Sequence, residues 1–122
     1  MYSIDDVNFL LDEIAEELPE EVFRELNGGV SLLDEVRRNV TEPNGGLYTL
    51  GEYRHDQMGR YIVLYYGSIR IIHGRESPDV FRESLRKLLV HELTHHIESL
   101  AGDRSLELDD ARRLRDYFGR FS

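Results

Sequence analysis

Apolar and polar positions follow a helical period at both ends of the chain and a strand period in the middle. In residues 3–18 the apolar side chains recur every three or four positions, as in an amphipathic helix: Ile4, Val7, Leu10, Leu11, Ile14 and Leu18. Ser3 and Asp6 match a capping box at its start, and Pro19 predicts its end. Residues 20–26 predict a short second helix that stops before two glycines.

The middle of the chain predicts strands. Leu47–Arg54 alternates in polarity, Arg60–Tyr66 is rich in β-branched and aromatic residues, and the segment between them has the length of a hairpin connection. Val30–Val36 predicts a weaker first strand, and Gly67–Gly74 fits either a further strand or a short helical turn. Thr41–Gly46, which contains Pro-Asn-Gly-Gly, predicts a loop.

The longest helical pattern begins at Ser77, which fits the N-cap, with Pro78 at the first helical position. Its apolar face runs until Ala101-Gly102 and consists of Phe81, Leu85, Leu88, Leu89, Leu93, Ile97 and Leu100. A last helix is predicted at about Leu106–Phe118. We therefore expect one α+β domain over residues 1–122, in which a small, mostly antiparallel sheet packs on the long helix, with further helices at both termini.

Composition narrows the class of protein. The 122 residues include no cysteine, which excludes disulfides, thiolate–zinc sites and cysteine nucleophiles. No run of about 18 apolar residues occurs, and the N-terminal residues are acidic where a signal peptide would be basic. We therefore expect a cytoplasmic protein that does not bind membranes.

The net charge of −9 is unevenly distributed, because residues 1–27 hold nine acidic residues against one base, Arg24. Such a run usually marks a solvated helix face, and the alternative is a docking surface for a protein partner. Either way, the negative field would repel a nucleic-acid backbone, so nucleic-acid binding is not expected.

The segment His91-Glu92-Leu93-Thr94-His95 is an HExxH motif within the long helix. Helical positions i and i+4 share one face, so both imidazoles can reach one metal ion, with Glu92 beside it to act on a water molecule. The pattern favours a zinc-dependent hydrolase in which Glu92 is the general base and His91 and His95 bind Zn²⁺. The alternative is an amphipathic helix with two histidines by accident.

The chain resembles the minimal zincin-like metallopeptidase family, small bacterial proteins regarded as metallopeptidases. The resemblance covers nearly the whole chain, and its most specific parts are Leu26–Val30, Leu50–Tyr53, Tyr61–Gly67 and His91–His96 with its continuation to Asp103. It implies a minimal zincin-like fold, a zinc ion held by the HExxH histidines, and a peptidase-like site for a peptide or protein substrate.

The third zinc ligand departs from the family pattern, because catalytic zinc normally has three protein ligands. A short form of the family motif, HExxHxxGxxD, ends in a ligand Asp, whereas here Glu98 stands three residues after His95 and the first glycine is Gly102. This chain has more residues after His95 than the short motif has. If these residues extend the helix, Asp110 matches the ligand Asp of the family. The alternatives are Asp109, Glu107 and Glu98, although ligands at i, i+4 and i+7 of one straight helix do not converge on a tetrahedral ion.

Other candidate residues have structural explanations. His96 lies 100° around the helix from His95, so we expect it to form hydrogen bonds or to meet solvent rather than to share the ion. His55 and His73 are expected at the surface, and the tyrosines of the two strands are expected to pack the sheet, although one could donate to an oxyanion.

We therefore expect zinc-dependent peptide hydrolysis, with an extended substrate along the edge strand of the sheet. The alternative is a non-catalytic zinc-stabilised binding or regulatory module whose acidic N-terminal helix docks a partner. The physiological substrate and the oligomeric state are not determined by the sequence.

Overall fold

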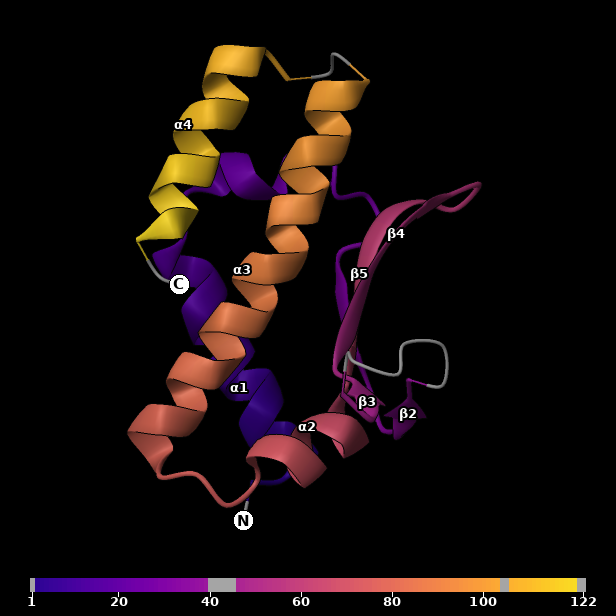
Figure 1. Ribbon diagram of the computed structural model, residues 1–122, viewed down its shortest axis with the longest axis vertical. Helices are drawn as coiled ribbons and strands as arrows, with labels where there is room; N and C mark the ends of the chain where they lie inside the picture. The colour runs from indigo at the N-terminus through magenta and orange to yellow at the C-terminus, as the bar shows by residue number, and fades with distance from the viewer. Residues whose placement is uncertain (1, 40–45, 104–105, 121–122) are drawn as a thin grey trace.

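A long helix, α3, lies between a small sheet and the two terminal helices (Figure 1). The computed structural model describes residues 2–39, 46–103 and 106–120. In these residues the elements are α1 (Ile4–Glu17), the 3-10 helix η1 (Glu20–Phe23), β1 (Val30–Leu33), β2 (Arg37–Arg38), β3 (Tyr48–Thr49), β4 (Gly51–Asp56), β5 (Gly59–Tyr65), α2 (Tyr66–His73), α3 (Pro78–Gly102) and α4 (Leu108–Gly119). The predicted α+β class is confirmed.

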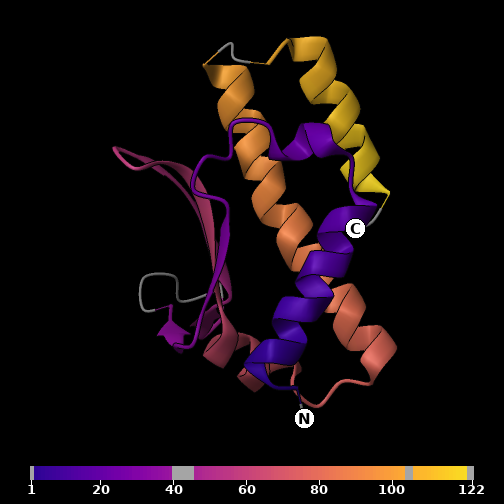
Figure 2. The same cartoon turned by 180° about the vertical axis from the view of Figure 1, so that it is seen from behind.

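The N-terminal helix forms as its sequence predicts. The Ser3 hydroxyl accepts a hydrogen bond from the backbone N–H of Asp6, and the Asp6 carboxylate accepts one from the backbone N–H of Ser3. These reciprocal bonds satisfy backbone donors that a helix start would otherwise leave unpaired. The apolar face of α1 packs behind α3, as the view from behind shows (Figure 2).

The three-stranded sheet has the order β1-β5-β4 and is mixed. β4 pairs antiparallel with β5, with Tyr53 opposite Ile62, whereas β1 pairs parallel with β5, with Val30 opposite the same residue. The expectation of a mostly antiparallel sheet therefore holds for only one of these two ladders. The reason is the long crossover from β1 to β5, which passes through β2, β3 and β4 and brings the chain back in the original direction. A separate antiparallel ladder joins β2 to β3.

Close packing brings the edge strand β4 against α3. Ile62 and Leu64 on β5 have no solvent exposure, and they join α1, α3 and α4 in one continuous hydrophobic core. A side chain at Gly51 would meet Leu64 Cδ2 at 2.7 Å and Leu88 Cδ1 at 3.4 Å. Glycine at this position therefore leaves room for the Leu64 side chain of β5, and Leu88 of α3 packs beside it at an ordinary contact distance.

Several segments differ from their predicted form. The segment 67–74, which fitted either a strand or a helical turn, is helical: residues 67–73 belong to α2 (Tyr66–His73), and Gly74 is its C-cap. The hairpin turn is shorter than predicted, since His55 pairs with Arg60 inside the ladder. The last helix begins at Leu108 rather than Leu106. Most of the loop predicted at 41–46 lies outside the described residues.

None of the described helices is long and apolar enough to cross a membrane.

Part of the negative charge of the N-terminal run is neutralised by ion pairs with arginines of the same chain. Three of its side chains pair with arginines of α3 and α4: Glu13 with Arg82 (3.0 Å), Glu17 with Arg86 (2.6 Å) and Glu21 with Arg113 (2.6 Å). Each pair is at least partly exposed, so each contributes at most about 1 kcal/mol to stability. A docking role for this surface stays a prediction, and these carboxylates have partners within the chain.

We predict that Ser3→Ala destabilises the protein, because it removes the side-chain acceptor of the α1 capping box. The expected loss is about 1 kcal/mol in the free energy of unfolding, measured by urea denaturation. Ser77→Ala is the matched control, because Ser77 is also an N-cap residue but its side chain forms no capping hydrogen bond. Equal losses in the two variants would contradict the importance of the capping box.

Candidate metal centre

The HExxH residues lie in an open cleft of about 640 Å³ between α3 and the edge strand β4. Both sides of the cleft contribute residues: Gly51, Glu52 and Tyr53 from β4, and His91, Glu92, His95, Glu98 and Ser99 from α3. The structure therefore brings together three of the four predicted site residues. It also places them beside a strand whose outer edge pairs with no other strand among the described residues.

The two histidines face one another across one turn of α3. Their Nε2 atoms are 3.3 Å apart, and both side chains are exposed to solvent. Two nitrogens that bind one tetrahedral zinc ion at about 2.0–2.1 Å lie about 3.3–3.4 Å from each other. The separation of the histidine nitrogens therefore fits a shared zinc ion.

Glu92 lies at the inner wall of the cleft, and only 5% of its surface is exposed. Burial raises the pKa of its carboxyl above the usual value, and the nearby Glu52 adds to this increase. His95 and a hydrogen bond from the backbone of Tyr53 act in the opposite direction. The carboxyl group is thus held against β4 in a poorly solvated position, where a raised pKa makes it a better proton acceptor.

His96 points away from the cleft into the core, as predicted. Its Nε2 lies 2.7 Å from the carbonyl oxygen of Arg24, and its Nδ1 lies 2.9 Å from the hydroxyl of Tyr53. A carbonyl only accepts, so Nε2 carries the proton and Nδ1 accepts from the tyrosine. Burial lowers the pKa of His96, in keeping with this neutral tautomer. Of the two predicted alternatives, hydrogen bonds or contact with solvent, the structure shows hydrogen bonds.

A buried arginine extends this hydrogen-bond network. Arg60 of β5 is 6% exposed and donates to the Tyr53 hydroxyl at 3.3 Å. It also donates to the Ser99 hydroxyl and the Asp103 carboxylate, both at the C-terminal end of α3. The sequence offered no signal for this role, because Arg60 is an ordinary polar residue at the start of a strand pattern. The network connects the central strand, the edge strand and the helix that carries the histidines.

The structure does not bring Asp110 to the histidine pair. Its carboxylate lies 3.8 Å from the guanidinium of Arg113, which binds Glu21 of η1, so this face of α4 is turned toward η1. The physical reason is the length of α3, which continues seven residues beyond His95 to Gly102, about 10 Å further along the axis. The chain turns back only after that point.

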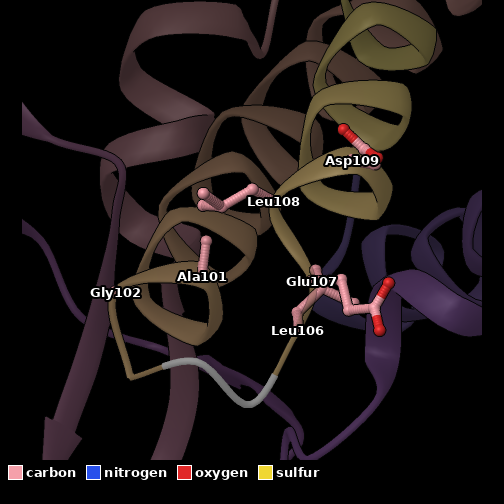
Figure 3. Close-up of a pocket in the computed structure, with 6 residues that line it drawn as sticks. All are labelled: Ala101, Gly102, Leu106, Glu107, Leu108 and Asp109. Atoms are coloured by element: carbon pink, nitrogen blue, oxygen red, sulfur yellow. The ribbon is translucent and has the colours of Figure 1, made fainter.

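The alternative ligands are divided between two places. Glu107 and Asp109 line a cavity of about 490 Å³ at the end of α3, beside Ala101 and Leu108 (Figure 3). Glu98 lines the cleft with the two histidines, and its side chain has no ion pair in the part of the chain that the structure describes. Within residues 2–39, 46–103 and 106–120, no group of three or more His, Asp or Glu side chains is arranged to hold a metal ion.

The remaining histidines lie outside the cleft. His55 is exposed in β4, and His73 Nδ1 lies 2.9 Å from the Glu76 carboxylate. Tyr65 is fully buried in the sheet, as predicted, and the Tyr53 hydroxyl is engaged by His96 and Arg60. No tyrosine hydroxyl is therefore assigned as an oxyanion donor.

Comparison with known proteins gives one informative similarity. No family model matches the sequence, and no curated protein matches it. The chain is similar to the solved structure of conserved hypothetical protein TTHA0227 from T. thermophilus, with 31% sequence identity and a TM-score of 0.69. The similarity covers 83% of this chain and 99% of that one. The name of that protein assigns no activity.

We predict that Tyr53→Phe destabilises the fold, because it leaves His96 Nδ1 without its donor and removes one acceptor of Arg60. The expected loss is about 1–3 kcal/mol in the free energy of unfolding, measured by urea denaturation. Tyr61→Phe is the matched control, because its hydroxyl donates to Asp56 at the exposed end of the same hairpin. A loss at Tyr53 no larger than at Tyr61 would contradict a stabilising role for the network.

Proposed function

We propose that this chain, which belongs to the same family as conserved hypothetical protein TTHA0227, is a zinc-dependent peptidase with a minimal zincin-like fold. The observation that supports it is the pair of Nε2 atoms 3.3 Å apart, next to a buried carboxyl and an open strand edge. The matched protein has no assigned activity, so the proposal comes from the chemistry of these residues.

His91 and His95 would hold the ion, and Glu92 would be the general base. Bound zinc supplies Lewis-acid polarisation of a peptide carbonyl and lowers the pKa of water. Glu92 takes the proton of the attacking water and passes it to the leaving amine, a role that its raised pKa favours. The backbone of Tyr53 holds the Glu92 carboxylate in place for both transfers.

The edge strand β4 offers a binding surface for an extended peptide. The Tyr65 N–H donates to the Leu50 carbonyl, and antiparallel pairs alternate between bonded and non-bonded positions. Gly51, Tyr53 and His55 therefore direct their backbone groups away from β5. The Tyr53 N–H meets the Glu92 carboxylate, so Gly51 and His55 are the residues whose N–H groups face the open edge. An extended peptide could add to this edge as a further strand and pass in front of the histidines.

A second candidate function is a non-catalytic zinc-stabilised binding module. The observation that favours it is that the described residues hold only two ligands in position, whereas catalytic zinc usually has three. The buried Glu92 favours the peptidase, because a structural zinc site needs no base beside it. Measurements of metal binding and hydrolysis in the same variants distinguish the two functions.

We predict that the purified protein binds about one equivalent of zinc and that His91→Ala or His95→Ala abolishes stoichiometric binding, because one histidine alone holds zinc poorly. Metal content after dialysis, measured by mass spectrometry, checks this. His55→Ala is the control, because His55 is exposed in β4 outside the cleft.

Within the same series, Glu98→Ala is expected to weaken zinc binding more than Asp110→Ala, because only Glu98 lines the cleft. Wild-type protein without zinc would contradict the metal centre.

We predict that Glu92→Gln keeps the fold and the zinc content and lowers peptide hydrolysis by about 10²–10⁴, because the amide cannot accept the proton. Cleavage of a broad peptide library by wild type and variant, with zinc content measured in parallel, checks this. Glu83→Gln, a change on α3 outside the cleft, should leave hydrolysis intact. If both wild type and Glu92→Gln bind zinc and neither cleaves any peptide, the binding module becomes the better assignment.

A further inference from the structure

A second depression adjoins the histidines on the side of α3 away from the sheet. We name it the α3–α4 groove; it has a volume of about 450 Å³ and is lined by Lys87, Val90, His91, Thr94, Arg115 and Phe118, among others. The α3 members are spaced at i, i+3, i+4 and i+7, so they form one face of the helix. His91 lines both the groove and the cleft, so the two adjoin at the candidate metal centre.

The groove combines an apolar floor with two cations. Val90 and Phe118 are 5% and 2% exposed and form the floor. The Thr94 hydroxyl donates to the Val90 carbonyl within α3, so it needs no partner in the groove. Lys87 and Arg115 are exposed, and neither has an ion pair in the part of the chain that the structure describes. Among the described residues, no acidic side chain lines the groove.

These two cations lie together at one groove, unlike the arginines of the molecule that pair with carboxylates. The chain has 24 acidic and 15 basic residues, and several of its arginines are paired with carboxylates, as Arg82 and Arg113 are. A lysine and an arginine without such pairs at one apolar groove leave positive charge available for a ligand. Guanidinium and ammonium groups bind carboxylates, and the apolar floor suits a short aliphatic stem.

We infer that the α3–α4 groove is a substrate subsite that binds a carboxylate next to the bond to be cleaved. The inference rests on the proposed peptidase function and names its substrate class: peptides with an acidic side chain, or with a free C-terminus, on the α4 side of the histidines. Lys87 and Arg115 bind the carboxylate, and Val90 and Phe118 contact the methylene groups that carry it.

Cleavage of matched peptides tests the subsite. In one series of pairs, the two peptides differ only in Glu against Gln at one position flanking the bond. In the other series, they differ only in a C-terminal carboxylate against a C-terminal amide. Comparing the two series separates the two sources of the negative charge. Wild type should prefer the charged peptide by about tenfold at one position, since two exposed ion pairs contribute up to about 1 kcal/mol each. The double variant Lys87→Gln/Arg115→Gln should bring the ratio close to one. Arg112→Gln, an exposed α4 arginine outside the groove, should not change it.

A binding measurement separates failure of the subsite from failure of the peptidase. Zinc-loaded Glu92→Gln protein is titrated with the same peptides, and the amide resonances of Thr94 and Phe118 are followed by NMR. Stronger binding of the charged peptide, lost in the double variant, supports the subsite even if no peptide is cleaved. Equal binding of both peptides, or an unchanged preference after Lys87→Gln/Arg115→Gln, overturns it whether or not hydrolysis occurs.

Discussion

The contact between α3 and the edge strand β4 is the constraint on which the candidate site depends. Leu88 of α3 packs beside Gly51, where a side chain would displace Leu64 of β5. The hydrogen bonds of His96 with Tyr53 and Arg24 then hold the helix in register with the strand. As a result, α3 presents His91, Glu92 and His95 to the open edge of the sheet. These residues lie on the helix face next to His96. Burying a neutral histidine with both nitrogens satisfied is favourable, whereas an unpaired polar group there would be costly.

Charge is arranged differently on the two sides of the molecule. On the side of α1 and η1, acidic side chains pair with arginines of α3 and α4, which ties the termini to the central helix. On the side of the histidines, the cleft contains Glu52, Glu92 and Glu98, and the adjoining groove contains Lys87 and Arg115. A substrate that crossed both would meet a carboxyl group suited to proton transfer and then a cationic subsite. The acidic total charge of the chain therefore gives no indication of the charge that the site itself selects.

The length of α3 explains why Asp110 does not lie beside the histidines. The helix extends through Gly102, and α4 then returns along it with Asp110 turned toward η1. The returning helix instead contributes Arg115 and Phe118 to the groove beside His91. The returning helix α4 thus forms one wall of the proposed subsite, while its Asp110 faces away from the histidines.

Local patterns in the sequence determined the N-terminal helix, the long helix, the last helix, the two main strands, the capping box and the HExxH face, because each depends on residues within a few positions of one another. They left α2 open between a strand and a helical turn. They also indicated that His96 points away from the ion. The tertiary structure alone decided the parallel pairing of β1 with β5, the burial of Arg60 against Tyr53, and the position of Asp110. These features depend on where distant segments meet, and neither periodicity nor spacing encodes the path of a crossover. The proposed zinc chemistry therefore follows from a local motif, whereas the proposed choice of substrate depends on how α3 and α4 pack together.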